Sequence, residues 1–216
     1  MSSEEEESDE LMDLEKIRDQ IMSQPLGDYD RMQVSAWEDD DKDIEETRNA
    51  KDPLQRAMLT AAENGDLDKV KSYYALDPSL VKCADSDGYT PLHRACYGNH
   101  TKIIEFLLQA GADISAKTQD DWQPLHSACC WNNVECAAIL IAQGANVNAK
   151  SKGDQTPLHL VSASSHNSPC LQLLLLHPDT DPHIKNSSGD TAFDIAKRTG
   201  KHYPLFEIIE PCLNEI

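Results

Sequence analysis

The sequence predicts an all-α solenoid of about five stacked helix–turn–helix units, joined by β-hairpin-like turns and preceded by a disordered acidic tail. The first observation behind this is a repeat: Thr-Pro-Leu-His at 90–93 returns as Gln-Pro-Leu-His at 123–126 and Thr-Pro-Leu-His at 156–159. The spacing is 33 residues from 90 to 123 and 33 again from 123 to 156, a fixed period typical of stacked helical repeats. The second observation is that residues 1–50 hold 18 Asp/Glu but 5 Lys/Arg, so this segment repels itself and buries little apolar surface.

Each unit repeats more than this tetrapeptide. In the first clear copy, small residues follow at 95–96, an apolar stretch at helical spacing runs over 103–108, and Gly111 stands where a helix would end. Degenerate copies occur at 61–70 and 189–196, as an array needs at its ends. These motifs resemble the ankyrin repeat family. The resemblance implies a repeat domain over 53–216, with units at about 53–86, 87–119, 120–152, 153–187 and 188–216.

Residue types at the start of the first helices have physical explanations. Pro91 lacks an N–H at a position where the helix does not use one. Thr90 and Thr156 stand where a side chain can cap the free N–H groups of the first turn. The family resemblance adds a role for the motif histidines, which would tie their own turn to the neighbouring unit. These histidines are His93, His126 and His159.

The repeat departs from its pattern in the turns and in one loop. Asp121 stands at the position of Gly88, and the next turn carries its glycine one position early, as Gly153. Segment 162–169 is two residues longer than its counterparts, so we expect a wider loop between helices there.

The tail carries two further features besides its charge. Its apolar residues over 10–22 recur at helical spacing, and they predict either a short amphipathic helix that enters a partner's groove or a solvated spacer. Ser2 and Ser3 each have a glutamate three residues later, a pattern typical of acidophilic kinase substrates. We therefore expect modification at these serines to add charge to the tail without switching a fold.

Composition excludes several classes of partner. The net charge is -19, and neither the tail nor the repeat region has the basic surplus that phosphate binding requires, so no direct nucleic-acid contact is expected. No apolar run approaches the roughly 20 residues of a membrane-spanning helix. The seven cysteines are odd in number and lack paired spacing, which favours a reducing compartment, the nucleus or the cytoplasm. We expect a monomer.

The sequence also predicts that the protein is not an enzyme and holds no metal or cofactor. Histidines repeated once per unit stand about 10 Å apart, the spacing of packed helices, which is too far for a shared metal at bonds of about 2 Å. Cys129 and Cys130 are adjacent and have no CxxC or HxxxH partner. Cys96 and Cys129 stand at equivalent positions that favour core packing. There is no glycine-rich phosphate loop and no nucleophile with a base at motif spacing.

Positions that the repeat leaves open indicate a partner-binding surface. In this family the residue before the motif Thr, and the pair after the small residues of the first helix, point outward and commonly bind partners. Four aromatics occupy these positions in adjacent units: Tyr89, Tyr97, Trp122 and Trp131. Aromatic residues are enriched at binding hot spots, although such rings could equally cover the neighbouring turn. Asn148 matches asparagines that are hydroxylated in other ankyrin proteins.

The expected function is recognition of a protein partner on the concave face, as an adaptor or regulator. The alternative is an assembly chaperone for a multisubunit complex, in which the acidic tail blocks a basic surface and makes binding sensitive to salt. The acidic tail with its Trp motif, together with 191–199 and 203–208, resembles a small family member usually placed in the nucleus. That resemblance implies nuclear, transcription-linked work.

Overall fold

The computed structural model describes residues 52–163, 169–199 and 203–206, together with Lys16 and Asp19. The tail features predicted at 1–50, the wider loop at 164–168 and residues 207–216 lie outside the described residues. The helices are α3 (Pro53–Asn64), α4 (Leu67–Leu76), the 3-10 helix η1 (Pro78–Lys82), α5 (Pro91–Tyr97), α6 (Thr101–Gln109), α7 (Pro124–Cys130), α8 (Val134–Ala142), α9 (Pro157–Ser162), α10 (Pro169–Leu175) and α11 (Ala192–Thr199).

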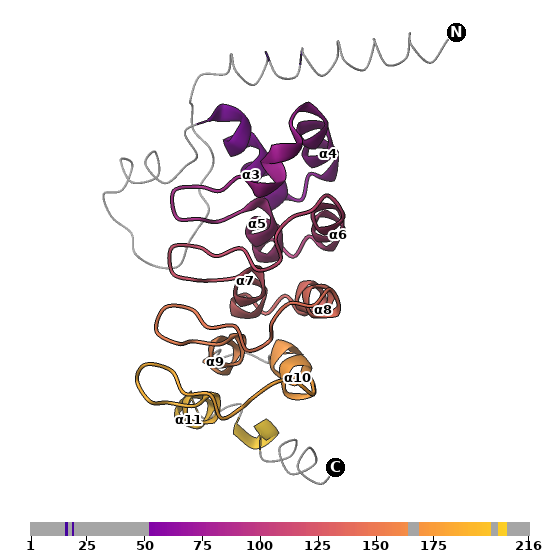
Figure 1. The fold of residues 1–216 in the computed structure, drawn as a ribbon. Coiled ribbons are helices and arrows are strands. Elements are labelled where there is room, and N and C mark those ends of the chain that lie inside the picture. Colours follow the sequence, from indigo (N-terminus) through magenta and orange to yellow (C-terminus); the bar gives the residue numbers. More distant parts are fainter. Residues whose placement is uncertain (1–15, 17–18, 20–51, 164–168, 200–202, 207–216) are drawn as a thin grey trace.

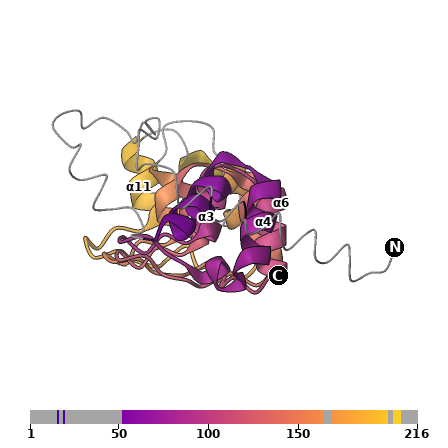
Figure 2. The ribbon, with the colours of Figure 1, turned by 90° about the horizontal axis from the view of Figure 1, so that it is seen from above.

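These helices form an ankyrin-type stack, as the sequence predicted. Figure 1 shows α3, α5, α7, α9 and α11, the first helices of successive units, in one column, with α4, α6, α8 and α10 in a second column. The first helices α3, α5, α7 and α9 each pack on the next first helix and on the second helix of their own unit. The loops between units project to the same side in the view along the stack (Figure 2). We call the side formed by these loops and the first helices the inner side.

First helices begin at the repeated tetrapeptide because the residue before each proline is extended. Thr90, Gln123 and Thr156 have ψ between 163° and 167° and serve as N-caps. The proline that follows takes the first helical position in α5, α7 and α9, where its missing N–H costs nothing. In α11 an alanine replaces the proline, and Thr191 and Asp194 instead bond each other's backbone N–H groups.

The loops between units are hairpins closed by backbone hydrogen bonds. The N–H of Asp85 donates to the carbonyl of Tyr89 at 3.1 Å, and the N–H of Thr118 donates to that of Trp122 at 2.9 Å. Neighbouring hairpins are bonded to each other as well: the N–H of Gln119 donates to the carbonyl of the preceding hairpin's Asp87 at 2.7 Å. The later hairpins repeat both contacts. Within the described residues these loops form one isolated β-bridge and no extended strand.

Asp121 keeps the backbone conformation of the glycine that it replaces. Gly88 has φ +86°, and Asp121 and Asp154, 33 and 66 residues further on, have φ 59° and 57°. A left-handed backbone suits glycine, and aspartate is among the few other residues that adopt it. Gly153 also has a positive φ, of 84°, so this hairpin contains two successive left-handed residues.

The core is a continuous apolar seam between the two columns of helices. Equivalent leucines are buried in successive first helices, and equivalent leucines in successive second helices lie opposite them. These are Leu92, Leu125 and Leu158, and Leu107, Leu140 and Leu174, each at most 2% exposed. Burying such a side chain contributes about 1.5–3 kcal/mol, and each unit obtains that burial only from its neighbours.

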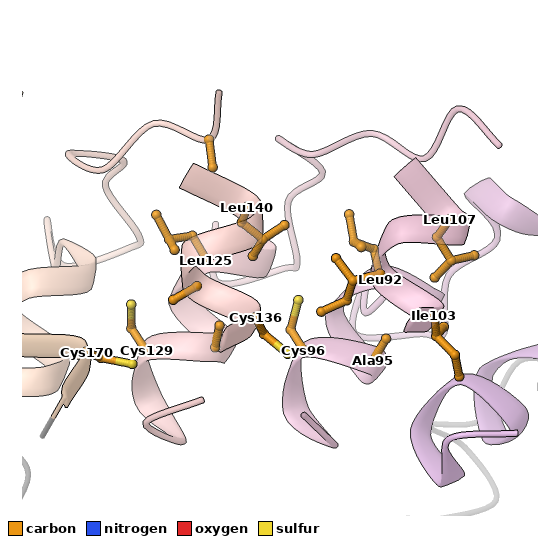
Figure 3. Close-up of a cluster of buried hydrophobic side chains, with 14 of the residues drawn as sticks. Leu92, Ala95, Cys96, Ile103, Leu107, Leu125, Cys129, Cys136, Leu140 and Cys170 are labelled. Carbon is orange, nitrogen blue, oxygen red and sulfur yellow. The ribbon is translucent and has the colours of Figure 1, made fainter. Parts of the chain in front are cut away.

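Cysteines fill gaps in this seam. Figure 3 shows Cys136 beside Cys96, and Cys170 beside Cys129, at junctions between helices of adjacent units. All four are buried and none forms a disulfide. Burial raises the pKa of the Cys136 thiol to about 12, so the thiolate that reacts with oxidants or metals is scarce at neutral pH.

Candidate partner-binding surface

Two of the four aromatic residues singled out in the sequence pack against each other at the surface, and one of them, Trp131, is exposed. Tyr97 ends α5 and Trp131 directly follows α7, so stacking of the two helices brings their rings together. The rings meet edge to face, with centroids 4.8 Å apart and an interplanar angle of 78°. The side chain of Trp131 is nevertheless 44% exposed, and Cys130 beside it is also exposed. We call Tyr97, Cys130 and Trp131 the Tyr97–Trp131 patch.

The other two aromatics lie over buried histidines instead. Tyr89 contacts the ring of His93 edge to face at 5.7 Å, and Trp122 stacks on His126 at 6.2 Å. Both aromatics are half-buried, and burial raises the pKa of the Tyr89 hydroxyl. Their position corresponds to the alternative considered from sequence, in which some rings cover the repeat itself. Tyr97 is half-buried as well, so Trp131 alone of the four has an exposed ring.

The motif histidines form a ladder that links successive hairpins. The Nδ1 atom of His93 accepts the N–H of Thr90 at 3.3 Å, while its Nε2 atom lies 3.0 Å from the carbonyl oxygen of Trp122 in the next unit. Because a carbonyl can only accept, Nε2 must carry the proton. His126 and His159 make the same pair of contacts in their own units, reaching the carbonyls of Gln155 and Asp190 at 3.2 Å.

This geometry keeps the histidines neutral. Burial lowers the pKa of His93 to about 4, and it also lowers the pKa values of His126 and His159. Protonation would place a second N–H against the backbone N–H that Nδ1 now accepts. These rings therefore hold neighbouring units together, and neither nitrogen is available as a general base.

An ionic cluster that the sequence did not predict joins the first two units. The guanidinium of Arg94 contacts Glu63 at 3.2 Å and Asp85 at 2.6 Å, and it also lies 5.5 Å from the centre of the Tyr89 ring. Burial raises the pKa of Glu63. Asp85 also bonds its own hairpin, where its Oδ1 atom accepts the N–H groups of Asp87 and Tyr89. The one sequence signal was an arginine at a position that holds Ser127 and Leu160 in later units.

Asn148 lies at a bridge between two linking segments. Its side-chain N–H donates to the carbonyl of Asp179 at 2.6 Å, and its Oδ1 accepts the N–H of Asp181 at 3.0 Å. Both ends of the amide are therefore engaged by the next unit, and a modifying enzyme would have to open these bonds first. Ser2 and Ser3 lie outside the described residues.

The described residues contain no cluster of three or more histidine, cysteine or acidic side chains that could hold a metal ion. Burial raises the pKa of the Cys83 thiol to about 12, as it does for Cys136. Among the same residues, no helix has both the length and the apolar character needed to cross a bilayer.

Comparison with known proteins agrees with this architecture. Two family models, both described as ankyrin repeats, match residues 57–151 and 140–196. Ankyrin repeat domain-containing protein 49 of Homo sapiens is 53% identical over 182 residues, which are 82% of this chain and 76% of the relative. The protein of the same name from Drosophila melanogaster is 48% identical over 200 residues, 92% of this chain and 90% of the relative.

A shorter likeness involves a different protein. The 26S proteasome non-ATPase regulatory subunit 10 of Rattus norvegicus is 43% identical over 60 residues, 28% of this chain and 26% of the relative. The stacked helices, the histidine ladder and the long matches to relatives agree with one another, and the chain belongs to the ankyrin repeat family, among the relatives of ankyrin repeat domain-containing protein 49.

Proposed function

We propose that this protein is a non-enzymatic adaptor or regulator that binds a protein partner on the concave, inner side of its ankyrin stack. The observation that carries the proposal is the Tyr97–Trp131 patch, in which the Trp131 side chain is 44% exposed and its ring contacts a second ring whose centroid is 4.8 Å away. Tryptophan and tyrosine bury much area with few rotatable bonds, so little conformational entropy is lost when a partner covers them.

The geometry of the repeats supports recognition rather than chemistry. Both nitrogens of each motif histidine are engaged: Nδ1 accepts a backbone N–H of its own unit, and Nε2 donates to a carbonyl of the next unit. Desolvation raises the pKa of the Cys83 and Cys136 thiols to about 12. A rigid repeat surface with an exposed aromatic pair suits a partner that is itself a protein. A nuclear site of action with a transcription-linked role belongs to the same proposal, and it rests on family resemblance.

Assembly chaperoning is the second candidate. It is favoured by the 60-residue likeness to a protein named as a regulatory subunit of the 26S proteasome, which is a multisubunit complex. In this alternative the acidic tail, with a net charge of -13 from 18 acidic and 5 basic residues, would contribute electrostatic binding that falls as ionic strength rises.

Affinity purification with matched variants tests both candidates. The full chain, residues 51–216 and the Tyr97→Ala/Trp131→Ala double variant would serve as bait, with Tyr89→Ala/Trp122→Ala as the control pair. The adaptor proposal expects the same partner on the full chain and on 51–216, at low and at high salt, and its loss from the Tyr97/Trp131 variant with an unchanged melting transition. The control pair should lower the melting temperature instead.

Two results would separate the candidates or reject the surface. A partner that disappears with the tail or at high salt would favour the chaperone. Full retention of the partner by the folded Tyr97/Trp131 variant would show that the patch is not the binding surface.

A further inference from the structure

The inner side around the Tyr97–Trp131 patch is apolar or neutral. In the following unit Ala163, at the position of Tyr97 and Cys130, is exposed, and Leu160, one helical turn earlier in α9, is half-buried. The nearest cation of a first helix is Arg94, and both of its terminal nitrogens are already bound, to Glu63 and to Asp85. A partner lying on this surface therefore meets rings and small apolar groups rather than charge.

The hairpin that precedes α7 adds negative charge to the inner side of the unit that carries Trp131. Asp120, at the tip of the hairpin that precedes α7, is exposed and forms no ion pair within the described part of the chain. The neighbouring Asp121 and Lys117 lie 3.4 Å apart and offset each other. The unpaired charge is positive in the next hairpin, where the exposed Lys152 has no ion-pair partner among the described residues. The acidic edge thus coincides with the units that carry the aromatic patch.

The dimensions of the surface match an α-helix. The seven residues of α7 span about 10 Å at 1.5 Å per residue, close to the diameter of a helix with its side chains, which is about 10–12 Å. Packed units repeat at about 10 Å along the stack, while residues i and i+7 of a helix stand about 10.5 Å apart on one face. A helix lying along the stack can therefore place one apolar side chain per unit without distortion.

We propose that the partner element is an amphipathic helix with basic flanks, which lies along the stack with its apolar stripe on the Tyr97–Trp131 patch and its basic side chains beside Asp120. This inference rests on the proposed function and specifies the chemistry of the partner. The apolar stripe supplies most of the affinity, as in other complexes of a helix in a groove. Exposed ion pairs contribute little to affinity, so the basic flank adds little binding energy. Its role is to distinguish basic from acidic partners of the same apolar pattern.

A displayed library of 20-residue helical peptides tests the proposal directly. Each peptide has leucine at helical spacing and either Lys, Glu or Gln at every flanking position, and the library is panned on the full chain. We expect Lys to be enriched at least fivefold over Glu. Asp120→Lys should reduce that preference severalfold, and the matched variant Lys152→Glu, which extends the acidic edge, should leave it unchanged or increase it.

The Trp131→Ala variant separates the patch from the tail, because it keeps every charge of the tail. Lysine enrichment that persists on Trp131→Ala would assign it to the tail and overturn the inference. Binding that requires Trp131 but shows no preference for Lys, or prefers Glu, would overturn the basic helix while leaving the proposed function intact. Absence of any Trp131-dependent peptide would count against both. Iodoacetamide labelling of Cys130 gives a local readout, and bound peptide should slow it.

Discussion

The histidine ladder predicts that acid weakens the fold through His93 in particular. An unfolded histidine has a pKa near 6.5, whereas His93 in the stack has a pKa of about 4 because it is buried between two hairpins. A base whose pKa is depressed by folding stabilises the protein above the unfolded pKa, and this contribution is lost as the pH falls toward the folded pKa. The sensitive window is therefore about pH 6.5 to 4.

The size of the effect follows from these two values. At pH 5 the unfolded chain binds nearly one proton more at this position than the folded chain does. Integrated from pH 7 to pH 5, the difference lowers the free energy of unfolding by about 2 kcal/mol, since one pKa unit corresponds to about 1.4 kcal/mol. For a domain of this size, that loss lowers the melting temperature by about 4–8 °C.

Chemical denaturation of the wild type and of His93→Gln at pH 7 and pH 5 measures this contribution. The variant is expected to be less stable at pH 7, because a hydrogen bond between units is changed, but to lose about 2 kcal/mol less than the wild type on acidification. His183→Gln, at an exposed position, is the control and should follow the wild type. Equal pH dependence in the wild type and His93→Gln would refute the neutral, buried histidine on which the reasoning depends.

Two further predictions concern the junction between the first units and the hairpin turns. Arg94→Met should destabilise the domain by about 3 kcal/mol, because it leaves two carboxylates without their cation, and adding Asp85→Asn should restore part of that loss in urea denaturation; additive losses would contradict a shared cluster. Gly88→Ala and Gly111→Ala should each cost about 1–2 kcal/mol for a left-handed backbone. Gly88→Ala should cost more than Gly111→Ala, because its Cβ would stand 2.9 Å from the Cα of Thr118 whereas Gly111 faces open space; equal melting temperatures for the two variants would contradict this contact.

Much of the fold followed from the sequence because its causes are local. A proline after an extended capping residue starts α5, α7 and α9 at the repeated tetrapeptide, and Gly111 and Gly144 have the positive φ that ends a helix. The 3-10 helix over 78–82 was not predicted. Its N-cap is Asp77, whose carboxylate accepts the N–H of Ser79. Asp113 and Asn146 make the same contact in the later units, where the chain forms a turn in place of a helix.

The candidate surface followed from the sequence in part. Register alone placed four aromatics at outward positions, but the exposure of each ring depends on what the adjacent unit puts beside it. Tyr89 lies against the guanidinium of Arg94, and Trp122 lies on the His126 ring. Among the residues that the structure describes, Trp131 has Tyr97 as its ring partner, and 44% of its surface stays exposed. Its role in binding stays a prediction until a partner is tested.

The sequence by itself determined the period of the stack, the position of its helices and its membership of the ankyrin family, because capping, helical spacing and turn chemistry act between residues close in the chain. Only the tertiary structure decided which charges and rings meet across units. Glu63 and Arg94 are 31 residues apart, as are His159 and the carbonyl of Asp190, and such contacts depend on how each unit is rotated and spaced on the next. That placement leaves Trp131 exposed while Tyr89 and Trp122 cover the histidines.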